Sequence, residues 1–295
     1  MAANLISIAN SGARAARAAL DITAQNISNA SSDGYVRRSV SLAELAVNSV
    51  SAAPTAINLA GVRVAGIVRN ADMFRQSEVR RTGADAARAD AEVQGLENVE
   101  AAVEQTGVYT SIVDFEAALK QLLSDPVDGS LRASALEQGR TLAQTINTAA
   151  SSLDAAGDGL RFEAQDGVDQ VNTLAAELAR VNLRLSRASD SSSDQSSLLD
   201  QRDSLLEKIS TYVDTSTTFA SDGTVVLHLG GSSGPDLVNG GTATSLAMAT
   251  ASDGTLTFTL GGTAAGIASG SIAGKNQALA ELCLLYTSDA ADDLL

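Results

Sequence analysis

Few side chains in this 295-residue sequence belong to the types that perform chemistry, and their spacing matches no catalytic pattern. His228 falls in an alternating stretch, on the face opposite Leu227 and Leu229. A catalytic base there would need a nucleophile and an orienting acid, and the spacing identifies neither. Asp200 and Asp203 could ligate a hard cation as a carboxylate pair, but a solvated helix face is the commoner explanation of such a pair.

Glycines before Lys275 superficially resemble a phosphate-binding loop. Ser269 stands where the first glycine is needed, and Asn276 follows the lysine in place of serine or threonine, so the pattern fails. With one His and one Cys, the chain has too few ligands for a zinc or iron–sulfur site. We therefore expect no enzyme activity, no catalytic residue, no cofactor and no metal.

The overall charge excludes two classes of partner. The sequence carries 20 Lys and Arg against 35 Asp and Glu, a formal net charge of −15. Neither nucleic acid nor an anionic membrane surface is a suitable partner for such a chain. Ten Arg fall within residues 1–90, so this part is basic and the remainder strongly acidic. Either the N-terminal third of one copy meets the acidic body of another, or both surfaces are simply solvated.

The segment from Leu198 to Leu206 places an arginine between two leucine pairs. Arg202 has no acid three or four residues away, so its charge either meets an acid from another helix or extends to solvent over its leucine neighbours. In the first case the segment would orient a helical bundle. Its candidate residues for that role are Leu198, Leu199, Asp200, Arg202 and Asp203.

The elements that position these residues are mostly helical, beginning with residues 4–29. Small and apolar residues recur there at strict three- and four-residue spacing, which is a coiled-coil seam. The seam, a candidate assembly interface, consists of Leu5, Ile8, Gly12, Ala15, Ala19, Ile22 and Asn26. An isolated alanine-rich helix is marginal in water, so we expect it to be stable only among other helices.

A tight turn should follow this helix. Asn26, Ile27, Asn29, Gly34 and Tyr35 lie where asparagine and glycine tolerate positive φ and short polar side chains bond to nearby backbone. Arg14 and Arg17 rule out a secretory signal in the first thirty residues.

The sequence predicts a mainly α fold: a long coiled-coil-like helical bundle with a small inserted β-rich domain. Further seams run from about Asp72 to Gln105, with Val79 and Val93 on the buried face, and from Leu131 onward, interrupted at 157–159. Ser111 and Ser197 resemble capping-box residues that open helices.

After Tyr212 the hydrophobic period changes from 3.6 to 2. A hairpin is indicated at Ser221-Asp222-Gly223, and the same tripeptide recurs at 252–254. The expected divisions are an N-terminal axial helix and turn (1–36), a helical body with short extended segments (37–210), the β-rich domain (211–264), the start of a returning helix (265–282) and a non-native tail (283–295).

Two of these motifs, taken together, resemble a known family. Ser11-Gly12, Leu20, the run Ala24–Asn29 and Gly34-Tyr35 are similar to the N-terminal signature of bacterial flagellar axial proteins, and Leu198–Asp203 is similar to a segment of the hook-associated protein 1 family. The likeness covers residues 1 to about 282.

The resemblance implies a structural component of the bacterial flagellum that joins hook to filament. It implies self-assembly as a ring of identical subunits through terminal helices, with hook protein and the next hook–filament junction protein as partners. It also implies an extracellular location reached through the flagellar export apparatus and a chaperone, without a cleaved signal peptide; the chaperone site would lie in a C-terminal region that this sequence lacks.

The end of the chain departs from the family, whose members finish with a long helix that pairs with the first. Residues 283–295 instead resemble translated sequencing-adaptor DNA, and we expect the native sequence to diverge after Leu282. Alternatives are another axial protein, such as a hook or distal rod subunit, or a cell-wall hydrolase on an axial scaffold. A surface coiled-coil adhesin would need an export signal or anchor that the sequence does not show.

Overall fold

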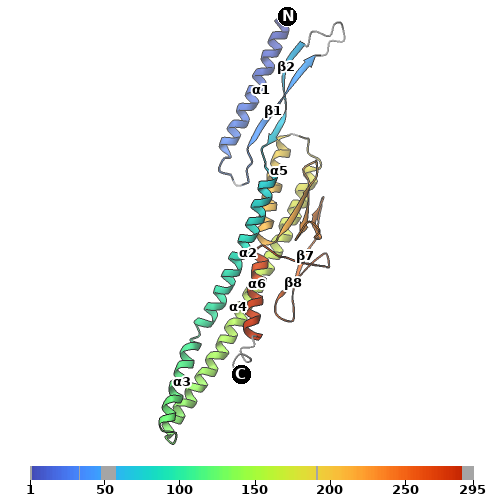
Figure 1. Ribbon diagram of the computed structural model, residues 1–295. Helices are drawn as coiled ribbons and strands as arrows, with labels where there is room; N and C mark the ends of the chain where they lie inside the picture. Colours follow the sequence, from blue (N-terminus) through green and yellow to red (C-terminus); the bar gives the residue numbers. More distant parts are fainter. Residues whose placement is uncertain (1, 33, 48–57, 191, 288–295) are drawn as a thin grey trace.

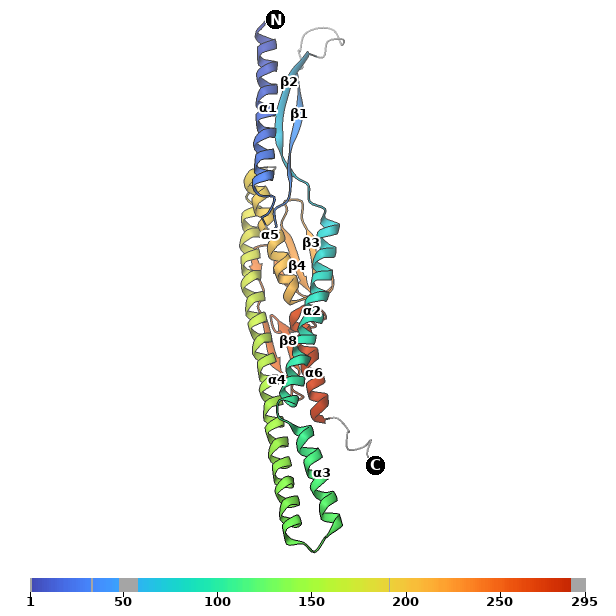
Figure 2. The same ribbon diagram turned by 90° about the vertical axis from the view of Figure 1, so that its left-hand side faces the viewer.

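The computed structural model describes residues 2–32, 34–47, 58–190 and 192–287 as an elongated molecule (Figures 1 and 2). An N-terminal unit of one helix and a hairpin occupies one end, a mixed helical and β body follows, and a helical hairpin forms the other end. The helices are α1 (Ala2–Ser28), α2 (Met73–Glu104), α3 (Val108–Ser124), α4 (Gly129–Leu185), α5 (Ser193–Tyr212) and α6 (Ser271–Thr287). The mainly α fold with small antiparallel sheets is the predicted class.

The N-terminal unit joins α1 to the antiparallel strands β1 (Arg38–Val47) and β2 (Asn58–Arg69). The helix packs along both strands, and its Ala15 and Ile22 are buried there. Gly61, at φ +106°, lies so close to α1 that a Cβ would collide with Ser11. The hairpin therefore belongs with α1 in space, although the sequence grouped residues 37–70 with the helical body.

Helix α2 has the predicted bounds but buries a different face. Asp72 caps it by accepting hydrogen bonds from the backbone N–H groups of the first turn. Val79 and Val93 are 55% and 54% exposed, so the predicted seam is wrong. The buried residues are instead Arg80, Ala84, Ala91, Gly95 and Val99. Small residues are needed on this face because α6 approaches very closely, and a Cβ on Gly274 would collide with the α2 backbone.

Helix α4 runs without interruption for 57 residues, so the predicted break at 157–159 is wrong. Gly157 serves packing there: a Cβ would lie 3.0 Å from the Leu282 side chain of α6. Two predicted helix starts are also wrong. Helix α3 begins at Val108, and the Ser111 hydroxyl instead pairs with that of Thr145 on α4 at 3.1 Å.

Helix α5 begins at Ser193, four residues before the predicted start, because the Ser192 side chain accepts a hydrogen bond from the Gln195 backbone N–H. Helix α6 extends the returning segment predicted at 265–282 to Thr287. It therefore includes the first residues of the expected non-native tail, and the rest of that tail, residues 288–295, lies outside the described residues.

Two small antiparallel sheets lie against α4. One has the order β3-β4-β5-β6 and contains the predicted hairpin, and the other has the order β7-β8-β9. The strands are β3 (Thr215–Phe219), β4 (Val225–Leu229), β5 (Asp236–Asn239), β6 (Thr242–Ala243), β7 (Leu246–Thr250), β8 (Leu256–Leu260) and β9 (Thr263–Ala265). They share one apolar core with α4, α5 and α6.

Two asparagines of α4 attach the sheets to the helix. The buried Asn182 amide donates to the Val225 carbonyl at 2.8 Å and accepts from the Val225 N–H at 3.1 Å. Asn172 makes the same pair of bonds with Leu246, at 2.9 and 2.8 Å. Each side-chain amide thus satisfies both backbone groups of a strand residue, as a neighbouring strand would.

Candidate functional site

The predicted turn and the predicted orienting segment meet at the base of α1. Asn26 organises the turn through its side chain. Its amide donates to the Arg38 carbonyl at 2.8 Å, and its Oδ1 accepts from the Arg38 N–H and the Tyr35 hydroxyl, each at 2.9 Å. One asparagine therefore ties the last turn of α1 to the first residue of β1.

The other predicted turn residues contribute differently. Ile27 is 73% exposed, and the Asn29 amide donates to the Gln25 carbonyl at 2.9 Å, near the end of the helix. Gly34 adopts φ +73°, and a Cβ there would lie 3.4 Å from Ser204 of α5. The turn therefore combines a left-handed glycine, as its sequence predicts, with close packing against α5.

An ion cluster joins the hairpin to α5. Asp200 accepts from Arg38 of β1 and Arg69 of β2, with each nitrogen–oxygen distance 2.7 Å. Asp203 accepts from Arg69 at 2.8 Å and from Arg202 at 2.6 Å. All five side chains are at most 15% exposed. Because isolated buried charges are costly, this arrangement requires all its members together.

Arg202 follows neither of the two predictions made for it. It is 5% exposed, so it does not extend to solvent, and its acid is the adjacent Asp203 rather than one from another helix. Its remaining contacts are the Gly223 carbonyl, at 2.6 Å, and the ring of Phe219, with the guanidinium carbon 4.6 Å from the ring centre. Burial lowers the pKa of Arg202, and the Asp203 carboxylate opposes that effect. Arg202 thus holds α5 to the β3–β4 hairpin.

The two leucines of the segment serve the core. Leu198 is buried in it, and Leu199 packs against it and lies under Gly223. Arg80 of α2 is buried beside this region, and burial lowers its pKa while Asp203 opposes the shift.

Helix α1 carries two apolar faces. Of the predicted seam, Ala15 and Ile22 are buried against the hairpin instead of a second helix, while Leu5 is 69% exposed and Ala19 is also exposed. On another face Ile6, Leu20 and Ile27 are 69%, 70% and 73% exposed. We define these three as the outer stripe of α1. Their seven- and fourteen-residue spacing is the signal that identifies it.

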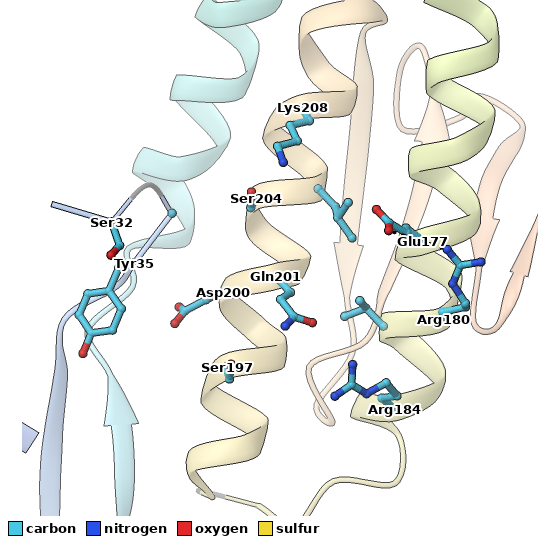
Figure 3. Close-up of a pocket in the computed structure, with 13 residues that line it drawn as sticks. Ser32, Tyr35, Glu177, Arg180, Arg184, Ser197, Asp200, Gln201, Ser204 and Lys208 are labelled. Carbon is cyan, nitrogen blue, oxygen red and sulfur yellow. Dashed lines mark ion pairs between the residues drawn. The ribbon is translucent and has the colours of Figure 1, made fainter. Parts of the chain in front are cut away.

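A groove of about 620 Å³ opens between α4 and α5, beside the turn (Figure 3). Arg180 and Arg184 come from α4, and Ser197, Gln201 and Lys208 come from α5. Ser32 and Tyr35 of the turn complete one side. This groove was not predicted from the sequence, because its walls meet only in the folded chain.

Asp200 and Asp203, considered as a cation-binding pair, are bonded to arginines of the ion cluster, and the other two residues considered for chemistry lie apart from this region. His228 Nδ1 is 2.8 Å from the Asp236 carboxylate, and Lys275 pairs with Glu163 at 3.0 Å. Among the residues that the structure describes, no group of three or more His, Cys, Asp or Glu is arranged to hold a metal ion. Over the same residues, no helix combines the length and apolar character needed to cross a membrane.

Comparisons with known proteins agree on one family. The model of the flagellar hook-associated protein FlgK helical domain matches residues 93–293. Flagellar hook-associated protein 1 of Bacillus subtilis (strain 168) is 29% identical over 216 residues, 71% of this chain and 43% of the relative. The Escherichia coli (strain K12) protein of the same name is 27% identical over 248 residues, 83% of this chain and 44% of that protein.

A solved structure, the flagellar hook junction protein FlgK from Burkholderia pseudomallei, has a similar fold. Its TM-score is 0.54 at 21% identity, over 68% of this chain and 38% of that one. The chain thus spans less than half the length of the curated relatives it matches. Since the family model covers well over half of the sequence, the chain belongs to the FlgK family of flagellar hook-associated proteins.

Proposed function

We propose that the protein is a non-enzymatic structural component of the bacterial flagellum that joins hook to filament by self-assembly. Its partners are further copies of itself in a ring, the hook protein and the next hook–filament junction protein. It works outside the cell, which it reaches through the flagellar export apparatus and a chaperone, without a cleaved signal peptide. The names of the relatives support the flagellar role.

The observation that carries the proposal is the outer stripe of α1. Three large side chains, each about 70% exposed, lie along one face of a helix whose other apolar face is already covered by the hairpin. Burying such a side chain contributes roughly 1.5–3 kcal/mol. A helix with apolar residues at heptad spacing is the geometry of a coiled-coil partner, so this face is suited to helices of neighbouring subunits.

The ion cluster gives that surface a fixed direction. It connects α5 with both strands of the hairpin that supports α1, so the outer stripe is held at a set orientation to the body. We assign Asp200 and Asp203 the orienting role, and Arg202 secures Asp203 from within α5. The seam residues Ile8, Ala15 and Ile22 then act indirectly, by seating α1 on the hairpin.

The test is the double substitution Leu20→Glu and Ile27→Glu in the bacterium that carries the gene. Electron microscopy should show hooks without attached filaments, with unpolymerised filament protein in the medium. The matched control is Leu136→Glu, which changes a 65% exposed leucine on α4 and should leave filament attachment intact. Normal filament attachment in the double variant would overturn the proposal.

A further inference from the structure

We infer that the groove between α4 and α5 is a docking site for the acidic outer face of α2 from a second copy of this chain. The inference deepens the proposed function, and rests on it, by identifying a contact that joins neighbouring subunits. It depends on three features: the charge of the groove, the charge of α2 and the directions of the two helices.

The groove is basic although the chain as a whole has a formal net charge of −15. Arg180 and Arg184 lie on one wall and Lys208 on the other (Figure 3). Arg187 lines a second hollow of about 410 Å³, which shares Arg184 with the groove. Among the described residues, Arg184, Arg187 and Lys208 make no ion pair, and Arg180 has only a 3.9 Å contact with Glu177.

The acids along the groove do not neutralise these four cations. Asp200 is already bonded to the two hairpin arginines, Glu177 reaches only Arg180, at 3.9 Å, and Asp194 lines the second hollow. Val181 and Leu205 are buried beneath the mouth of the groove. A cationic groove with an apolar floor fits an acidic helix face that also carries apolar residues.

The outer face of α2 has that character. Asp90, Glu97, Glu100 and Glu104 are exposed at separations of seven, three and four residues, and within the described residues none of them forms an ion pair. The 54% exposed Val93 lies among them. We define these five residues as the acidic stripe of α2.

Within the part of its own chain that the structure describes, the acids of the stripe have no ion-pair partner, and their position on the helix is electrostatically unfavourable. Three of them fall in the last turns of α2, where the helix dipole already places partial negative charge, and the last turn holds no basic residue. Cations from another copy would relieve the repulsion between these carboxylates and the negative end of the helix dipole.

The spacings of the two charged sets match when the helices run in opposite directions. Reading forward, Arg180, Arg184 and Arg187 are separated by four and then three residues, and reading backward, Glu104, Glu100 and Glu97 are separated in the same way. An antiparallel contact therefore pairs three cations with three anions; Arg180 and Arg184 lie on α4, and Arg187 lies in the turn just beyond its end.

The fold makes such a contact compatible with copies that point the same way. Within one chain α2 descends from the N-terminal unit and α4 returns toward it (Figures 1 and 2). Antiparallel packing of α2 from one copy on α4 of the next thus preserves the common direction that subunits of a tube require. Since two different surfaces meet, the contact can repeat from copy to copy.

The contact also sets a stagger between copies. Gly95 of α2 lies beside Leu160 of α4 in the same chain, so Glu100 is level with about residue 155. Arg184 is about 29 residues further along α4, and at about 1.5 Å per residue this gives a displacement of about 44 Å. Asp90 and Glu97 are seven residues apart, so a second register is possible in which the helices are shifted by seven residues. In that register the displacement between copies is about 33 Å, Arg187 pairs with Asp90, and Arg180 pairs with Glu97.

The first experiment measures self-association of the full chain by sedimentation velocity at 50 and 500 mM NaCl. The background carries Leu20→Glu and Ile27→Glu, which suppress apolar association through α1. We expect salt-sensitive association in this background, weakened at least tenfold by Arg180→Glu, Arg184→Glu and Arg187→Glu together. Glu97→Lys, Glu100→Lys and Glu104→Lys should weaken it similarly, and mixing the two triple variants should restore it.

The matched control reverses Arg75, Arg132 and Arg140, which are exposed outside the groove and change the net charge equally. It should weaken association less than threefold. Equal weakening by control and groove variants, or no salt-sensitive association at all, would overturn the inference.

A second experiment identifies the contact directly. Lys208 is one of only three lysines in the sequence, so a zero-length carbodiimide crosslink from it is unambiguous. Mixed ¹⁵N-labelled and unlabelled protein should give crosslinks between copies from Lys208 to Glu104 in the longer stagger, or to Glu97 or Glu100 in the shorter one. Crosslinks from Lys208 to other acids only would contradict the inference.

Both measurements are made in solution and are independent of flagellar assembly. If the contact is found but α1 variants still attach filaments, the proposed function fails and the docking site stands. If α1 variants lose filaments but the contact is absent, the docking site alone is wrong.

Discussion

Replacing Asp200 with alanine should loosen the N-terminal unit without unfolding the body. Among the described contacts, the Asp200 carboxylate pairs only with Arg38 and Arg69, one from each strand of the hairpin. Removing one partner of a fully buried ion pair costs about 3–5 kcal/mol. Asp200 is 15% exposed and Arg69 keeps its bond to Asp203, so we expect a smaller cost, about 2–3 kcal/mol.

Hydrogen exchange followed by mass spectrometry measures this cost locally. At about 1.4 kcal/mol per tenfold change, peptides from residues 36–47 and 58–70 should lose protection by about 30- to 140-fold. Peptides from α5 and α4 should change less than threefold, because their core contacts do not involve Asp200.

Asp194→Ala is the matched control, since Asp194 is an exposed carboxylate at the start of the same helix. Its loss should cost about 0.3–1 kcal/mol through the helix dipole and leave the hairpin peptides protected. Equal loss of protection in the hairpin and in α5, or a change below threefold in the hairpin, would refute the role assigned to the cluster.

Three further predictions concern the body. Asp203→Ala should lower the free energy of unfolding by about 3–5 kcal/mol in urea titrations, because it strips the acceptor from buried arginines; a loss below 1 kcal/mol would contradict this. Gly274→Ala should destabilise the protein by about 1–3 kcal/mol, because the added methyl group forces α6 away from α2. Gly83→Ala is the matched control: Gly83 has open space around it, so this substitution should stabilise the protein by about 0.5–1 kcal/mol. Thermal melts in which both variants shift Tm in the same direction would refute the packing argument. The Thr224 hydroxyl and N–H lower the pKa of Asp222, so its stabilisation is present above the unfolded value near 3.9 and is lost as the pH falls through the folded pKa. Asp222→Asn should therefore lower Tm at pH 7 by about 1–3 °C, and the difference from the unsubstituted protein should shrink below about pH 4.

The sequence predicts helices well where local signals and periodicity agree. Helix α2 has the predicted bounds, and the Ser221-Asp222-Gly223 turn forms the expected hairpin. It fails where a neighbouring element decides which face is buried. Val93 is more apolar than Ala91, yet Ala91 is buried, because Gly274 of α6 approaches so closely that only a small residue fits there.

The candidate site was only partly predictable for a related reason. The Leu198–Asp203 segment signals a buried charge, but its partners, Arg38 and Arg69, lie more than a hundred residues away in sequence. The Arg202 guanidinium bonds to the carboxylate of the next residue, Asp203. Helix geometry does not predict this pair, because adjacent residues on a helix do not face each other. The asparagines that attach the sheets bond to backbone groups, which leave no pattern in the sequence.

The uninterrupted α4 has a mechanical consequence. At about 1.5 Å per residue its 57 residues form a strut about 86 Å long, tied to the sheets at Asn172 and Asn182. Stretching a helix requires breaking backbone hydrogen bonds, so the strut resists axial tension. The N-terminal unit, by contrast, joins the body through one short connection at residues 70–72, the packing of Gly34 near Ser204 of α5, and the ion cluster. A torque between the two parts should therefore deform those connections, while the body, which α4 stiffens, keeps its shape.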